Sequence, residues 1–401
     1  MNSLLRGGLG VCLALVTIVA QAAPDVPRLQ APADVRVIVD ISGSMKQNDP
    51  DNLRQPAIRL LARMLPEGST AGVWTFGEYV NMLVPHGKVD KAWRDLAIKQ
   101  SSKINSVALR TNLGRAMKVA SDTFYSGGDL SHTHFILLTD GKVDISADEA
   151  VNEAERKRVL GEVLDRYKKL GATIHTVALS DQADLDFLTT LATRTGGSEA
   201  IAKSADELNL AFLHALNAAV PQEQIPIRDN GFLVDSGVSE FTVLVFPGKT
   251  DTPLALKDPD GNPMTFDQHP DGVRWVHESS YDLITVDGPT AGGWTIDGTL
   301  GAGSRVTVVS DLKMVVSPLP AQFYRGDSVD VAATFYDGKN RITDPDFLSV
   351  ITVSLSLTTQ DGRSGTKVLS GDKPPADGVY RDQISKLTEP GDYTIRLVAD
   401  G

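Results

Sequence analysis

The stretch VRVIVDISGSM (residues 35–45) joins a hydrophobic run to a regular series of oxygen-bearing side chains. Its first five residues are mostly apolar and predict a buried strand. Asp40, Ser42 and Ser44 then follow at every second position. This D-x-S-x-S spacing is compatible with a turn that caps a helix, and also with three oxygen atoms directed at one cation. The rest of the sequence distinguishes between these two interpretations.

Strand-like and helix-like segments alternate from Val35 to Val220. Apolar runs that predict buried strands recur at Val35–Val39, Gly72–Phe76, Phe135–Leu138 and Ile174–Leu179. Amphipathic patterns predict helices over residues 53–65, 113–124 and 205–219, the last preceded by a capping box at residues 204–207. Strands buried on both faces and separated by helices indicate an α/β fold with a doubly wound, mostly parallel sheet. Ligands bind such sheets at the carboxyl ends of the strands.

The character of the sequence changes after Pro221. Short runs rich in β-branched residues are separated by turn signals such as Asp260-Gly261 and Asp287-Gly288. Two blocks, residues 221–311 and 312–401, show this pattern, which is typical of β-sandwiches. We therefore expect two all-β, sandwich-like domains after the α/β domain, the second of them Ig-like. Neither block shows a cluster of catalytic residue types.

The first 22 residues have the pattern of a secretory signal peptide. Arg6 precedes the apolar stretch Leu9–Ala20, and Ala20-Gln21-Ala22 matches a small-x-small cleavage site. The stretch is short for a membrane span, which needs about 20 apolar residues. The only cysteine, Cys12, lies in this segment. An exported mature chain beginning at Ala23 and lacking disulfides fits the bacterial periplasm or cell envelope.

Acidic residues outnumber basic ones. Removing Arg6 from the 39 basic residues leaves 38 against 51 acidic ones, a net charge of −13 for the mature chain. Such a surface repels nucleic acid and anionic lipid headgroups, so neither is expected as a partner.

Oxygen ligands from three loops are predicted to meet at one edge of the sheet. Asp40, Ser42 and Ser44 follow the first strand, Asp140 follows the strand HFILLT, and Thr111 precedes an amphipathic helix. Oxygen ligands without His or Cys select Mg²⁺, Mn²⁺ or Ca²⁺ over zinc or copper. Each residue alone could instead be a helix cap, with Thr111 or Asn112 capping the helix from Leu113. The convergence of the three loops favours the metal site.

At these residues the sequence resembles the von Willebrand factor type A family, over roughly Ala33 to Val220. The motif is that family's metal-ion-dependent adhesion site, with Asp40, Ser42, Ser44, Thr111 and Asp140 at its five positions. The resemblance implies that the serines and the threonine contact the metal directly and that the aspartates act largely through bound waters. It also implies an open coordination position, which a carboxylate from a partner protein fills. The stretch LLTDGKVDIS also resembles uncharacterised proteobacterial envelope proteins that carry this domain ahead of β-rich modules.

Other clusters favour structural roles. His132, His134 and His175 are too few convergent ligands for zinc, and edge or core histidines are the simpler interpretation. Asp144, Asp148 and Glu149 could serve a second cation, but residues 146–149 fit a helix N-terminus. Residues 258–262, DPDGN, resemble part of a calcium loop, although the following proline and the β context favour a turn.

The sequence therefore predicts a binding protein and not an enzyme, because it contains none of G-x-S-x-G, H-E-x-x-H or a glycine-rich phosphate loop. The expected partner is another envelope protein that offers an Asp or Glu carboxylate to the metal. Two alternatives remain: a metal-dependent hydrolase, and a structural spacer with a vestigial metal site. A membrane tether beyond the sequence shown, anchoring the protein to the inner membrane, is compatible with this interpretation.

Overall fold

The structure is a computed structural model. It describes residues 26–27, 32–181, 183–248, 253–310, 312–320, 322–359, 361–371, 373–385, 387 and 390–400. The predicted signal peptide, residues 1–22, lies outside the described residues and stays a prediction.

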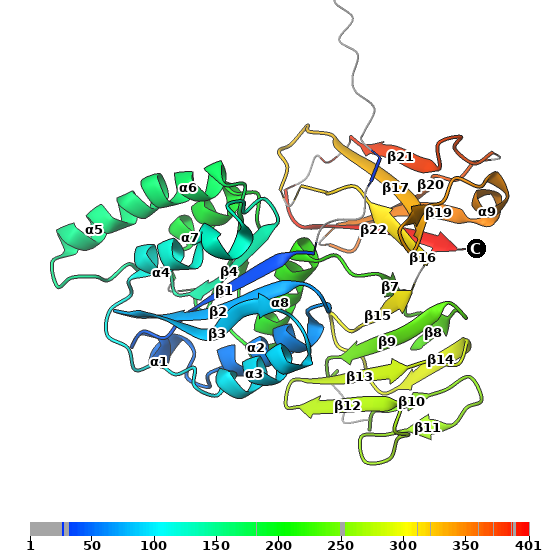
Figure 1. The fold of residues 1–401 in the computed structure, drawn as a ribbon, viewed down its shortest axis with the longest axis horizontal. Coiled ribbons are helices and arrows are strands. Elements are labelled where there is room, and N and C mark those ends of the chain that lie inside the picture. Colours follow the sequence, from blue (N-terminus) through cyan, green and yellow to red (C-terminus); the bar gives the residue numbers. More distant parts are fainter. Residues whose placement is uncertain are drawn as a thin grey trace, which may run out of the picture.

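The first structural unit is built on a six-stranded sheet (Figure 1). Its strands lie in the order β3-β2-β1-β4-β5-β6, and every neighbouring pair is parallel except the antiparallel β2–β3 pair. The strands are β1 (Asp34–Asp40), β2 (Thr70–Phe76), β3 (Val80–Lys88), β4 (Thr133–Thr139), β5 (Thr173–Ala178) and β6 (Glu199–Ile201). The predicted α/β fold with a mostly parallel sheet is confirmed.

Helices cover both faces of this sheet. One hydrophobic cluster joins a face of the sheet to α2 (Arg54–Met64), α3 (Lys91–Ser101) and α8 (Ala205–Ala219). A second cluster joins the opposite face to α4 (Leu113–Ala120), α6 (Leu164–Lys169) and α7 (Leu185–Thr193). The shorter elements are α1 (Met45–Asn48), a 3-10 helix at Thr123–Ser126, and α5 (Glu149–Arg158), which continues through a π-helical turn at Val159–Val163 into α6.

The structure contains elements that the sequence analysis did not predict, among them the helices α3, α5, α6 and α7, and one predicted helix is shorter. The edge strands β3 and β6 were not predicted, because β3 includes Pro85 and has only one buried residue, while β6 spans only three residues. The helix predicted over residues 113–124 ends at Ala120. Phe124 is therefore not part of the buried stripe, and its side chain is 85% exposed.

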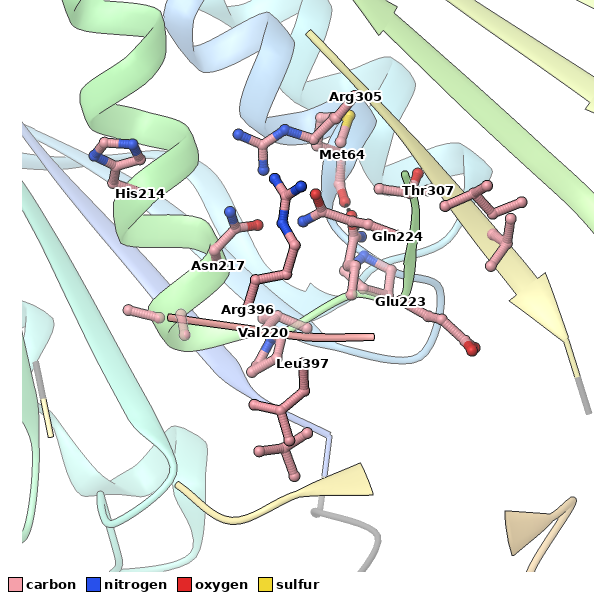
Figure 2. A pocket seen from close by; sticks show the side chains of 18 of the residues that line it. Met64, His214, Asn217, Val220, Glu223, Gln224, Arg305, Thr307, Arg396 and Leu397 are labelled. Atoms are coloured by element: carbon pink, nitrogen blue, oxygen red, sulfur yellow. Dashed lines mark hydrogen bonds between the residues drawn. The ribbon is translucent and has the colours of Figure 1, made fainter. Parts of the chain in front are cut away.

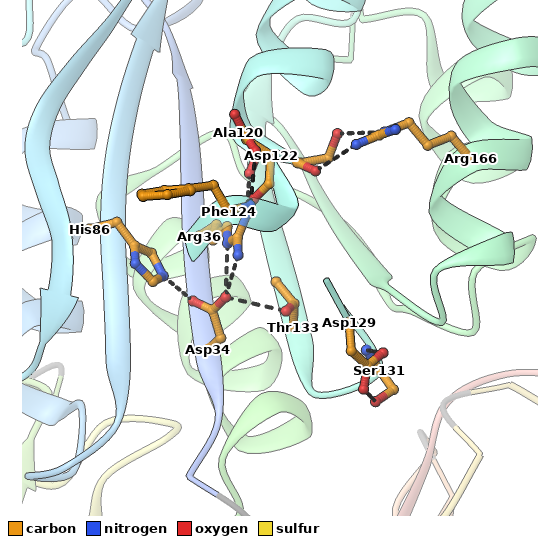
Figure 3. Close-up of polar contacts among 11 residues, drawn as sticks. Asp34, Arg36, His86, Ala120, Asp122, Phe124, Asp129, Ser131, Thr133 and Arg166 are labelled. Carbon is orange, nitrogen blue, oxygen red and sulfur yellow. Dashed lines mark hydrogen bonds and ion pairs between the residues drawn. The ribbon is translucent and has the colours of Figure 1, made fainter. Parts of the chain in front are cut away.

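A buried ion pair fixes the start of β1 (Figure 3). Arg36 donates from Nε to Asp34 Oδ2 over 2.8 Å and from Nη1 to the carbonyl of Ala120 over 2.6 Å. The other Asp34 oxygen lies 2.6 Å from His86 Nε2, and Thr133 also donates to Asp34. These contacts join β1 to β3, to β4 and to the end of α4. Asp34 and Arg36 therefore serve the fold.

β-sheets follow α8, as predicted from the change of sequence character. The first β-rich unit pairs the sheet β11-β10-β14-β8 with the sheet β12-β13-β9-β15-β7 around one apolar cluster. Its strands are β7 (Gln224–Ile225), β8 (Gly231–Val234), β9 (Val238–Val245), β10 (Ala255–Lys257), β11 (Pro263–Met264), β12 (Val273–Glu278), β13 (Tyr281–Asp287), β14 (Gly292–Asp297) and β15 (Arg305–Ser310).

The second β-rich unit has a sheet of β16, β17, β18 and β21 and a sheet β20-β19-β22. Its elements are β16 (Leu312–Val316), β17 (Val329–Asp337), β18 (Asn340–Arg341), α9 (Pro345–Val350), β19 (Thr352–Thr359), β20 (Ser364–Val368), β21 (Val379–Ile384) and β22 (Tyr393–Asp400). Figure 1 shows both β-rich units on the same side of the α/β unit. Among the described residues, no helix has the length and apolar character needed to cross a membrane.

Candidate metal centre

The loops after β1 and β4 meet because the two strands are parallel neighbours. Asp40 is the last residue of β1, and Asp140 directly follows β4. Both aspartates are fully buried. The topology therefore places two carboxylates at the carboxyl edge of the sheet, where the sequence predicted a ligand site.

The third loop, residues 105–111, packs against the first. Ala108 donates its N–H to the carbonyl of Ile41 over 3.0 Å, and its backbone bridges Ser42. Gly77 makes this approach possible, because a Cβ at that position would lie 2.3 Å from the Ala108 Cβ. Thr111 forms a backbone bridge with Asp144, in the loop after Asp140. Backbone contacts thus link all three predicted loops.

The Asp40 carboxylate is held on both oxygens. Oδ1 accepts the backbone N–H of Ser42 over 2.8 Å, and Oδ2 accepts the Thr139 hydroxyl over 2.6 Å. Burial and the nearby charge of Asp140 raise the pKa of Asp40 to about 6, against these hydrogen bonds. Burial is the larger cause, and repulsion between the two carboxylates adds to it.

Asp140 is oriented by residues from two loops. Its Oδ2 accepts an N–H of the Asn48 amide over 3.0 Å, and its Oδ1 accepts the backbone N–H of Lys142 over 3.2 Å. Among the described residues, no Lys, Arg or His side chain forms an ion pair with Asp40 or Asp140. The site thus has buried negative charge without a cationic side chain to balance it.

The hydroxyls do not serve as helix caps. Ser44 stands at the N-cap position of α1, but its side chain makes no capping hydrogen bond. Its Oγ lies instead 3.0 Å from the Oγ of Ser42. Asn112, not Thr111, caps α4 by accepting the N–H of Arg115. The capping interpretation of Ser44 and Thr111 is therefore not supported by the geometry.

The side chain of Arg54 joins the first loop to the third through hydrogen bonds. Its guanidinium donates to the carbonyl of Asp40 through Nη1, and to the Ser106 hydroxyl over 2.7 Å through Nη2. Its Nε pairs with the buried carboxylate of Asp49. Arg54 itself is fully buried. It positions the backbone of the site without being a candidate ligand.

Residues 34–216 match the family model described as the von Willebrand factor type A domain. This part of the chain is a von Willebrand factor type A domain. Such domains commonly act in adhesion or protein interaction and are generally not enzymes. No curated protein matched the chain.

Solved structures with similarity to the chain include other proteins of this kind. A von Willebrand factor type A protein from Catenulispora acidiphila is 14% identical with a TM-score of 0.40, covering 78% of this chain and 64% of that one. The mussel byssus proximal thread matrix protein 1 with a zinc-occupied MIDAS motif is 17% identical with a TM-score of 0.37, covering 48% and 49%. An aerotolerance-related membrane protein from Bacteroides fragilis is 14% identical with a TM-score of 0.35, covering 46% and 98%. The chain thus spans under two thirds of the first two proteins.

The donor set of the type A domain fits a hard divalent cation. Two carboxylates and three hydroxyls supply only oxygen, the ligand type that Mg²⁺, Mn²⁺ and Ca²⁺ prefer. No group of three or more His, Cys, Asp and Glu side chains suited to a metal occurs in the part of the chain that the structure describes. A site with two carboxylates does not require such a group. The repulsion between Asp40 and Asp140 is what a cation between them would relieve.

The competing sites have structural explanations. His134 Nδ1 lies 3.1 Å from His175 Nε2, and the two rings stack, so these are core histidines. Asp144 pairs with Arg110, and Asp148 caps α5 by accepting the N–H of Ala150.

The loop at Asp258 is a turn. Its carboxylate accepts the backbone N–H groups of Asp260 and Asn262 and the Asn262 side-chain amide. Local donors therefore occupy the oxygens that a calcium ion would need.

The structure adds three residues that sequence analysis missed: Asn48, Arg54 and Thr139. Thr139 immediately precedes Asp140, so its place at the strand end could have been noticed. Asn48 and Arg54 reach the site through the fold of α1 and α2, and no spacing in the sequence marks them.

Proposed function

We propose that the type A domain binds a divalent cation of the Mg²⁺, Mn²⁺ or Ca²⁺ class through Asp40, Ser42, Ser44, Thr111 and Asp140. Through that cation it binds a carboxylate of a partner protein. The observation that supports this most is the pair of fully buried carboxylates, which have no cationic partner in the described part of the chain. The cation would supply the positive charge that attracts an external carboxylate, and neutral hydroxyl ligands would preserve that charge.

The surface around the site favours a protein partner over a free acid. Val107 and Leu109 flank Ala108, the residue bridged to Ser42, and their side chains are 69% and 73% exposed. Tyr79, whose carbonyl accepts the N–H of Gly77, is 65% exposed. Exposed apolar side chains grouped at one edge are typical of interaction sites. The partner surface we propose presents its Asp or Glu within an apolar surround.

We place the protein in the bacterial envelope on the basis of its N-terminal segment alone. The pattern of residues 1–22 supports export to the periplasm. The β-rich units would hold the type A domain away from its point of attachment, and an inner-membrane anchor beyond this sequence would serve that arrangement.

Calorimetric titration of Mg²⁺, Mn²⁺ and Ca²⁺ tests the metal site. Asp40→Asn should weaken cation binding by about 10–100-fold or more, because it removes one of two charges at the site. The Asp40→Asn variant should remain folded without metal, since the substitution also removes the repulsion between the carboxylates of residues 40 and 140. Asp258→Asn, at the exposed turn, is the matched control and should bind like wild type.

The partner step has a separate test. Proteins captured from envelope extract should bind in Mg²⁺ and be released by chelator, and Asp40→Asn should capture none. Because metal and partner share the site, each must strengthen the binding of the other by the same factor. If wild type in chelator and Asp40→Asn both still capture the proteins that wild type captures in Mg²⁺, the proposal is contradicted, and the D-x-S-x-S stretch is a structural turn.

A further inference from the structure

A second polar site lies far from the metal centre, in a cleft between the type A domain and the two β-rich units. The cleft has a volume of about 4160 Å³. At the part drawn in Figure 2, α8 and the chain just after it face β15 and β22. His214 and Asn217 come from α8, Arg305 from the start of β15, and Arg396 from β22. The type A domain and both β-rich units thus contribute side chains to one space.

Arg305 is held at this place by its own loop. Gly303 packs so closely on α8 that a Cβ there would lie 2.3 Å from the Cδ2 of Leu210. The Nε of Arg305 donates to the Gly303 carbonyl over 3.1 Å, which fixes the direction of the guanidinium. Among the described residues no acidic side chain pairs with Arg305, and burial lowers the pKa of this group. The outer N–H groups of Arg305 are therefore oriented but not neutralised.

Arg396 approaches from the opposite side. It is exposed on β22, and no described acidic residue forms an ion pair with it. Figure 2 shows its guanidinium pointing toward that of Arg305, with the amides of Asn217 and Gln224 reaching the same space. Two guanidinium groups directed at one another repel unless an anion lies between them.

The nearby ionisable groups do not supply that anion. Glu223 points away from the two arginines in Figure 2, and its pKa is raised to about 7 by burial and by Asp235, against Lys313. Burial and the charge of Arg305 lower the pKa of His214, and the charge of Asp392 opposes them. Among the described residues, Asp392 forms no ion pair with either arginine. In a chain with a formal net charge of −12, this is a locally positive site.

We propose that Arg305 and Arg396 form a binding site for a phosphate-type dianion, which would join the two β-rich units beside α8. Guanidinium groups bind phosphate oxygens through paired, charge-assisted hydrogen bonds. A dianion matches two guanidinium charges, whereas a single carboxylate balances only one. The amides of Asn217 and Gln224 would add neutral donors. The site is independent of the metal centre.

The test is titration of the full chain with inorganic phosphate at constant ionic strength, with acetate as the monoanion. Arg396→Gln should weaken phosphate binding at least about tenfold, and Arg305→Gln likewise. Arg396 is exposed, so its substitution should leave the unfolding transition unchanged without phosphate. Arg194→Gln removes an exposed arginine of the type A domain outside the cleft and should bind phosphate like wild type.

A second titration separates the sources of the phosphate group. Glycerol phosphate, the soluble form of a lipid headgroup, should bind more tightly than inorganic phosphate if the natural ligand is a phosphate ester, and no more tightly if it is the free ion. The proposal is overturned if wild type does not bind phosphate in preference to acetate. It is equally overturned if Arg194→Gln weakens binding as much as Arg396→Gln, because general charge screening would then explain the effect.

Discussion

Arg54 shows how a residue with no ligand atom can determine the metal centre. Its fully buried guanidinium contacts the carbonyl of Asp40, the hydroxyl of Ser106 and the carboxylate of Asp49. The sequence predicted helix α2 correctly, yet an arginine at the start of an amphipathic helix is expected on the solvent side. Its burial depends on how loop 105–111 folds back over the helix, and the helix's own sequence does not encode that.

Replacing Arg54 should damage stability and metal binding together. Arg54→Ala leaves Asp49 buried without its partner, and losing one member of a buried ion pair costs on the order of 3–5 kcal/mol. Arg54→Lys keeps the charge but cannot reach all the acceptors, so it should fold and bind metal more weakly than wild type. Urea unfolding and calorimetric metal titration measure both effects. If Arg54→Lys binds metal with wild-type affinity, Arg54 supports the fold without positioning the site.

At the scale of elements, the sequence predicted those strands and helices that have a clear local pattern of apolar residues. The four buried strands and the helix from Ala205 follow from apolar periodicity. Four candidate ligands follow from their places after strand ends, and Thr111 follows from its place before a helix. The antiparallel edge strand β3 was missed, because it has only one buried residue and Pro85 interrupts its apolar residues. The contact between Gly77 and Ala108, which brings the third loop to the site, joins residues of different loops and leaves no periodic signal.

The histidine pair on β4 and β5 should make the type A domain sensitive to mild acid. Burial lowers the pKa of His134 to about 4, helped by His132, and that of His175 to about 3, helped by His134. In the unfolded chain both should titrate near ~6.5. Below that pH the unfolded state binds more protons than the folded state, so the free energy of unfolding falls as pH drops from about 6.5 toward 4.

The free energy of unfolding should fall by a few kcal/mol, and the fall should level off near the pKa values of the two histidines in the folded protein. Urea unfolding measured from pH 7.5 to 4 would show it. His175→Gln should flatten the profile, whereas His269→Gln, at an exposed position in the first β-rich unit, should not change it. A wild-type profile that is flat between pH 6.5 and 4.5 would show that the pair is already protonated in the folded protein.

At the scale of the whole molecule, the first β-rich unit is continuous with the type A domain. Leu244, Phe246, Tyr281 and Leu283 belong to the same hydrophobic cluster as α2 and α8. The sequence predicted a boundary near Pro221 and the buried stripe of α8, which the structure confirms for Leu208, Phe212 and Leu216. It could not show that part of this cluster comes from residues beyond Pro221, because a helical stripe does not identify its partner.

Glu278 forms polar contacts between the same two units. Its carboxylate accepts two hydrogen bonds of 2.9 Å from Arg59 and another of 2.9 Å from Arg63, both on α2. Arg63 also donates to the hydroxyl of Tyr281. The three charged side chains are between 15% and 22% exposed, so water screens them only in part. This cluster fixes how the first β-rich unit sits on the type A domain.

Glu278→Ala should therefore loosen the joint between the two units. We expect a loss of about 1–2 kcal/mol, since both arginines can regain water when the carboxylate is removed. Hydrogen exchange should rise in α2 and β13, which meet at this joint, and stay unchanged in β4. A double-mutant cycle with Arg59→Ala should show positive coupling, because the two substitutions remove the same interaction. Glu240→Ala is the control, since it removes an arginine partner within the first β-rich unit, Arg274. If Glu278→Ala and Glu240→Ala change exchange in α2 equally little, the shared apolar cluster alone holds the two units together.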